Sequence, residues 1–101
     1  MTIEQVRNDL HDIRFYYANK KLFEEIKENL PPNEIEGKAI KYSLLISEAS
    51  PKLYLLYSAL YVLGKTQVDI ANEWCMSIGS IKNLSVKLNE FLHERINKEV
   101  H

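Results

Sequence analysis

The chain has 101 residues, the usual size of one domain, and its formal net charge of −1 excludes a strong overall attraction to nucleic acid or to an anionic membrane. Hydrophobic residues make up 46% and charged residues 27%, and only three Gly and three Pro leave little scope for the turns of a β fold, so we expect an all-α domain. A single cysteine, Cys75, excludes an internal disulfide, and the N-terminus lacks the pattern of a secretory signal, which favours the cytoplasm.

Residues 1–30 are predicted to form a long N-terminal helix that begins near Thr2. Apolar residues recur every three or four positions on one side of it, at Ile3, Val6, Leu10, Ile13 and Tyr17. This apolar stripe is interrupted at Lys20 and Lys21, resumes one step out of phase at Phe23, and ends before two prolines at 31–32. Such a helix can cover the core of its own domain or pack against a second copy, so an intramolecular bundle helix and a homodimer both stay open.

Two more helices are predicted in the middle of the chain. Asn33 can cap a connecting helix over residues 33–49, whose apolar positions are Ile35, Ala39, Tyr42, Ile46 and Ala49. Ser50 and Pro51 are typical of the start of the next helix, and Gly64 of its end. Residues 53–63 of that helix are almost entirely apolar but too few to span a membrane, so we expect the helix to be buried on most sides, with one face formed by Leu53, Leu56, Leu60 and Leu63.

The unit formed by residues 50–97 is predicted to contain a helix-turn-helix. Thr66 can cap a short helix whose inward residues are Ile70, Ala71 and Trp74. Cys75 then lies at a corner, Ser77 caps again, and a long final helix follows with apolar residues at mostly helical spacing. Two helices joined by so few residues cross steeply, and the start of the second is the part that can enter the major groove of DNA.

These residues resemble the fourth region of sigma factors. The matching positions are Thr66, Ile70, Ala71, Trp74, Met76, Ser77, Ile81 and Leu84, and the preceding segment SPKLYLLYSAL looks like the helix that comes before the motif in that family. With a long N-terminal helix in front of it, the chain is similar to small phage late-gene transcription regulators of the ArpU and RinA type. The resemblance implies a non-enzymatic protein that binds double-stranded promoter DNA, RNA polymerase or a sigma factor.

The chain departs from the sigma pattern at two places. Cys75 stands at the corner where that family usually has glycine, so the corner is either differently shaped or strained by a left-handed residue, at roughly 1 kcal/mol. The start of the last helix has no arginine, and Lys82 and Asn83 are its best candidates for contacting bases or phosphates. Residues 75–89 nevertheless contain Lys82 and Lys87 and no acid, which gives the helix a small positive patch.

The sequence thus predicts a DNA-binding regulator of transcription that reads promoter DNA with the helix beginning at Ser77. We expect Ser80, Lys82, Asn83 and Lys87 to lie in the groove, and Thr66, Gln67 and Ser77 to lie near phosphates. The rival interpretation is an adaptor that binds polymerase, a sigma factor or a phage protein through an exposed apolar patch at Ile78, Met76 or the tyrosines. A purely structural helical oligomer is the third.

Enzymatic chemistry has almost no support in the sequence. Cys75 has no histidine and acid at a spacing that would order a catalytic site. His11 and His93 each have two acidic neighbours, but neither set has the second histidine or the cysteine pair that is typical of a metal site. No glycine-rich phosphate loop occurs. We therefore expect no enzymatic activity, no cofactor and no metal.

Overall fold

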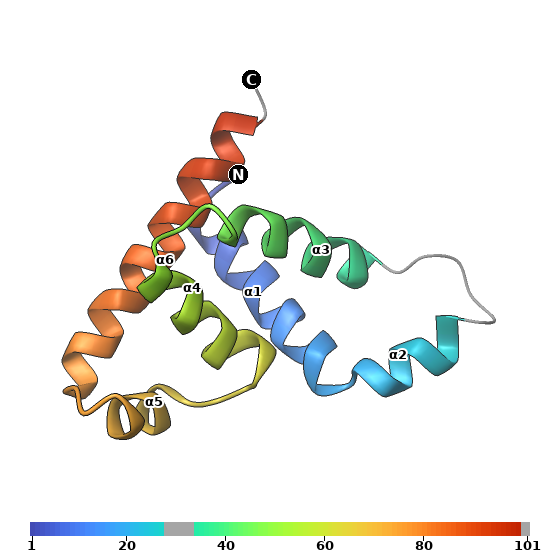
Figure 1. Cartoon of the computed structure of the whole chain (residues 1–101). Helices are drawn as coiled ribbons and strands as arrows, with labels where there is room; N and C mark the ends of the chain where they lie inside the picture. The colour runs from blue at the N-terminus through green and yellow to red at the C-terminus, as the bar shows by residue number, and fades with distance from the viewer. Residues whose placement is uncertain (28–33, 100–101) are drawn as a thin grey trace.

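The computed structural model describes residues 1–27 and 34–99, and the described residues are helical, with no strand among them (Figure 1). The elements are α1 (Ile3–Ala18), α2 (Lys20–Lys27), α3 (Glu34–Ile46), α4 (Pro51–Tyr57), a π-helical turn η1 (Ser58–Val62), α5 (Gln67–Glu73) and α6 (Ile78–Glu99). The predicted all-α class and the N-terminal helix are confirmed. No helix in this described part is long and apolar enough to cross a membrane.

The N-terminal helix starts where it was predicted but is shorter. The side chain of Thr2 accepts a hydrogen bond from the Gln5 amide at 3.2 Å, and the Gln5 side chain accepts one from the Thr2 amide at 2.8 Å, which is a capping box. Asn19 then ends α1, because its amide and its side chain both bond the carbonyl of Phe15. A single helix over residues 1–30 is therefore wrong: α2 begins at Lys20, where the apolar stripe is interrupted, and residues 28–33, with the predicted Asn33 cap, lie outside the described part.

The apolar stripe of α1 covers the core of its own domain. Its buried residues are Val6, Leu10, Ile13 and Tyr16, and the helix packs against η1, α3 and α6. Polar contacts join α1 to α3 as well: the Tyr42 hydroxyl donates to Asp9 at 2.8 Å, and the Lys38 ammonium pairs with Asp9 at 3.2 Å and with Asp12 at 3.0 Å. The sequence left two roles open for this stripe, packing in its own domain or against a second copy. In the structure it packs in its own domain.

The helix that starts at Pro51 has the predicted cap and stop but an unexpected interior. Ser50 caps it, and past Tyr57 it widens into the π-helical turn, with the Leu63 amide bonded to the Ser58 carbonyl at 2.8 Å. Gly64 ends it with a φ of 70°. The prediction that this helix is buried on most sides is wrong. The wide π-helical turn takes an extra residue, so Leu63 points away from the core and is 66% exposed. Tyr54, Leu55 and Val62 are exposed too.

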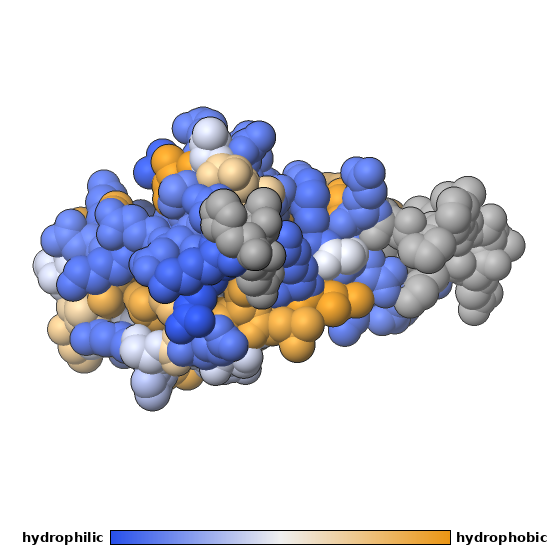
Figure 2. Space-filling model, turned by 90° about the horizontal axis from the view of Figure 1, so that it is seen from above, coloured by the Kyte–Doolittle hydropathy of each residue, from blue (hydrophilic) through white to orange (hydrophobic). Residues whose placement is uncertain are grey.

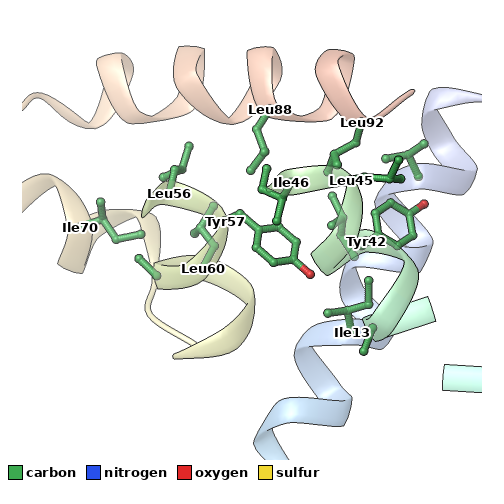
Figure 3. Close-up of a cluster of buried hydrophobic side chains, with 14 of the residues drawn as sticks. Ile13, Tyr42, Leu45, Ile46, Leu56, Tyr57, Leu60, Ile70, Leu88 and Leu92 are labelled. Atoms are coloured by element: carbon green, nitrogen blue, oxygen red, sulfur yellow. The ribbon is translucent and has the colours of Figure 1, made fainter. Parts of the chain in front are cut away.

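One core joins the middle and the C-terminal part of α6 to the rest of the domain. Figure 3 shows Leu88 and Leu92 of α6 pointing toward Ile46 of α3 and toward α4, where Leu56 and Tyr57 meet them. These side chains are at most 2% exposed. The middle and the C-terminal part of α6 therefore anchor the helix to α3 and α4, while its N-terminal part packs against α5, with Ile81 fully buried (Figure 1).

The corner between α5 and α6 has a left-handed residue, one of the two possibilities left open by the sequence. Cys75 has a φ of 54°, the only positive value at a residue other than glycine in the described part. The Met76 amide reaches back to the Ala71 carbonyl at 2.9 Å and the Cys75 amide to the Asn72 carbonyl at 3.4 Å. This is the Schellman arrangement, in which glycine is usual at the left-handed position.

Replacing Cys75 with glycine is expected to stabilise the protein by about 1 kcal/mol, since glycine has no Cβ to oppose a positive φ. For a domain of this size that corresponds to a rise in melting temperature of roughly 4–8 °C. Cys75→Ala is the matched control, because it removes the thiol and keeps the strained Cβ, and it should bring no such gain. A fall in melting temperature for Cys75→Gly would reject strain at this corner.

Candidate nucleic-acid interface

Local hydrogen bonds fix the starts of the two helices that form the predicted helix-turn-helix. At α5, the Thr66 hydroxyl accepts from the Asp69 amide at 3.1 Å and the Asp69 carboxylate accepts from the Thr66 amide at 3.3 Å. At α6, the Ser77 hydroxyl accepts from the Ser80 amide at 3.1 Å. The Gln67 side chain donates to the buried Ser85 hydroxyl at 3.2 Å, so a polar contact also holds α5 against α6.

The predicted reading residues lie on two sides of α6. Lys82, Asn83 and Lys87 are all exposed. Lys82 and Lys87, however, are five positions apart, which is about 140° around a helix with 3.6 residues per turn. Asn83 and Lys87 share the outer side, whereas Lys82 borders the α1 side, so the small positive patch predicted for this helix is divided between two sides of it.

Lys82 borders an open groove of about 760 Å³ between α1, α5 and α6. Thr66 and Gln67 line it at the start of α5, and Ser85 and Asn89 line it on α6. Across from them, α1 contributes a second set of lining residues: Arg7, His11 and Arg14. None of the lining residues in the described part is acidic. The groove therefore concentrates positive charge in a chain whose formal net charge is −1.

Sequence reasoning missed these three residues of α1. Their signal is present in the sequence, because positions 7, 11 and 14 are spaced by four and three and fall on one line of a helix. That line lies beside the apolar stripe of α1, and only His11 of it was considered from the sequence, as a metal ligand. Only the folded structure, in which α1 packs against α6 and η1, places this line across a groove from Lys82.

The basic side chains that line the groove differ in their hydrogen bonds and ion pairs with the rest of the chain. Arg14 donates from Nη2 to the Gly64 carbonyl at 2.9 Å, so it also helps to close the end of η1. Arg7 and Lys82 have no ion pair within 4.0 Å in the described part of the chain. Burial raises the pKa of Tyr61 on the groove wall, and the charges of Arg14 and Arg7 partly oppose that rise.

Apolar side chains share the same groove. Val68 of α5 and Ile78 and Val86 of α6 line it, and Ile78 is 39% exposed. A second hollow lies at the corner, where Trp74 and Met76 meet Lys52 and Leu55 of α4. Trp74 was expected to face the core, and it packs at the core's edge and is half-buried. Exposed Ile78 is the feature that the rival adaptor interpretation predicts.

Elsewhere the surface is mixed. Figure 2 looks down on α3 and the C-terminal end of α6, where hydrophilic side chains cover most of the middle of the face and an apolar strip lies along one edge. Ile40 and Leu44 of α3 are exposed. Within the described residues no three His, Cys, Asp or Glu side chains gather as a metal site would need. His93 instead bonds the Met1 carbonyl at 2.9 Å.

Comparison with protein-family models, with curated proteins and with solved structures finds no match to this chain.

Proposed function

We propose that the chain is a DNA-binding regulator of transcription that reads double-stranded DNA with the first half of α6. The observation that carries the proposal is the α5–α6 corner, which leaves Lys82, Asn83 and Lys87 exposed on a helix without an acid between residues 75 and 89. A helix presented in this way suits the major groove of B-DNA. The likeness to the fourth region of sigma factors supports promoter DNA as the target. It also supports a phage-encoded regulator that acts in the cytoplasm.

The reading residues have distinct roles in this proposal. Asn83 can pair with the N6 and N7 edge of adenine, and Lys82 and Lys87 can contact guanine or phosphate. Thr66, Gln67 and Ser77 lie at or beside helix starts, where amide groups favour a phosphate. Ser80 lies between these sets, and its hydroxyl bonds that of Ser77 at 2.9 Å.

A homodimer would double the positive surface that one copy offers to DNA. The buried stripe of α1 is not free to form it, because Val6, Leu10 and Ile13 pack inside the domain. A dimer through the N-terminal region would therefore use surface outside that stripe, such as α2, where Leu22 is 53% exposed.

A second candidate function is an adaptor for RNA polymerase, a sigma factor or another phage protein. Exposed Val68, Ile78 and Val86 favour it, since apolar side chains in a groove fit a partner helix better than they fit phosphate. Arg7 and Lys82 would then face acidic side chains of that helix.

The test is binding of the purified protein to mixed-sequence duplex DNA at about 50 and 200 mM salt, beside the Lys82→Glu, Lys87→Glu double variant. Two phosphates neutralised by these lysines predict a loss of roughly tenfold in wild-type affinity over that range of salt. We expect the double variant to lose binding at the lower salt.

Lys20→Glu, Lys41→Glu is the matched control, because it changes the net charge equally on α2 and α3, at residues that do not line the groove. It should bind nearly as the wild type does. Equal losses in the two double variants would mean that α6 does not bind DNA, and absence of wild-type binding at the lower salt would favour the adaptor.

A further inference from the structure

Arg7, His11 and Arg14 of α1 face Lys82 across the groove, and they differ in whether they are bonded to other residues of the chain. Arg14, at one end, is bonded to the Gly64 carbonyl. Arg7 and His11, toward the start of the helix, have no hydrogen bond or ion pair within the described residues, and both are exposed. Their side chains are therefore available to a ligand.

We propose that Arg7 and His11 form a second phosphate-binding wall, which holds the sugar-phosphate backbone of the DNA duplex that α6 reads. This inference rests on the proposed function and adds to it a contact from a helix outside the helix-turn-helix. Its chemical basis is the juxtaposition of α1 with the starts of α5 and α6 around one groove.

Charge is the first argument for a polyanion in this groove. Arg7, Arg14 and Lys82 bring three formal positive charges to its walls, and none of the described lining residues is an acid that would neutralise them. Like charges that face each other raise the free energy of the unbound protein, and an anion between them removes that repulsion. A chain with a net charge of −1 has enough acids to neutralise these groups, yet places them elsewhere.

Shape and position are the second argument. The groove is open and has a volume of about 760 Å³, and basic side chains lie on two of its walls instead of converging on one point. Duplex DNA presents a negative charge about every 1.7 Å along its axis, so cations on separate walls can meet successive phosphates. Thr66 and Gln67, which the proposed function places near phosphates, line the same groove.

A contact of this kind positions the protein without reading bases. An arginine guanidinium pairs with phosphate oxygens, and an imidazole N–H donates a hydrogen bond to them, in both cases regardless of base sequence. We therefore expect Arg7 and His11 to set how strongly binding depends on salt, whereas Asn83 sets which sequence is preferred.

The experiment compares the salt dependence of duplex binding for the wild type, for Arg7→Gln, His11→Gln, and for Lys41→Gln. Loss of one phosphate contact lowers the slope of log affinity against log salt by about one, and we expect at least that change in the α1 variant. Lys41→Gln, which removes an equal charge from α3, should leave the slope unchanged. The single variant Arg7→Lys keeps the charge and should keep the wild-type slope, which separates a charge contact from a structural role of Arg7.

The outcomes separate this inference from the function on which it rests. If the α1 variant keeps the wild-type slope while Lys82→Glu, Lys87→Glu loses binding, DNA is bound by α6 and the second wall is wrong. If the wild type binds no duplex but binds a synthetic amphipathic helical peptide with leucine on one face and glutamate on the other, and Arg7→Gln, His11→Gln weakens that complex, the groove takes a protein and both proposals fail. A thermal melt of each variant checks that it is folded.

Discussion

Raising the pH from about 9 to about 11 is expected to lower the free energy of unfolding by about 3 kcal/mol, because Tyr42 and Tyr57 cannot ionise inside the fold as they do in the unfolded chain. Both phenols are buried, and burial raises the pKa of each. For Tyr42, the Asp9 carboxylate that accepts its hydrogen bond raises the pKa further.

The direction of this pH effect follows from the protonation state of the tyrosines that the folded protein favours. The unfolded tyrosines ionise near pH 10, and the folded ones only well above it, so the native state holds more protons between these values. The stabilisation is fully present below pH 10 and is lost by about 1.4 kcal/mol per pH unit for each tyrosine as the pH rises. Urea unfolding at about pH 9, 10 and 11 measures the loss, and phenolate absorbance reports when the tyrosines ionise.

Tyr57→Phe is the matched control for this pH dependence. The Tyr57 hydroxyl is buried and has no hydrogen-bond partner within the described residues, so removing it should leave stability at neutral pH unchanged or raise it by up to about 1 kcal/mol. The loss above pH 10 should then shrink by about half. If all tyrosines ionise near pH 10 in a protein that stays folded, the environments of Tyr42 and Tyr57 are not as described.

The features of the fold that sequence predicted well are local ones. Ser50, Thr66 and Ser77 cap helices as expected, and Thr2 caps the N-terminal helix where it was expected to begin, because each cap bonds an amide only three positions away. Gly64 ends its helix for the same local reason. The sequence indicated the break at Asn19 only weakly, through the interruption of the apolar stripe at Lys20 and Lys21.

The parts that sequence did not predict depend on packing. The π-helical turn exposes Leu63, and no periodicity rule anticipates an extra residue within a helical turn. Arg7 and Lys82 are 75 positions apart in the sequence, so the groove between them required the fold. The placement of Lys82 and Lys87 on different sides of α6, in contrast, follows from their spacing of five and was open to prediction.

Replacing Leu88 with alanine is expected to destabilise the protein by about 3 kcal/mol, since a fully buried leucine loses transfer free energy and leaves a cavity. Leu88 lies at the centre of the anchor that joins α6 to α3 and α4 (Figure 3). Urea unfolding at neutral pH measures the loss. Val86→Ala is the control on the same helix, because Val86 is 46% exposed and its truncation should change stability by no more than about 0.5 kcal/mol.

This prediction also separates the anchoring of α6 from the binding of DNA by its exposed residues. A domain of this size has a stability of about 5–15 kcal/mol, so a loss of about 3 kcal/mol leaves most of the Leu88→Ala protein folded at 25 °C. If Leu88 serves only to anchor the helix, the folded variant should bind duplex DNA with the wild-type salt dependence, because Lys82, Asn83 and Lys87 are unchanged. A stability loss no greater than that of Val86→Ala would instead show that Leu88 is not buried in the core.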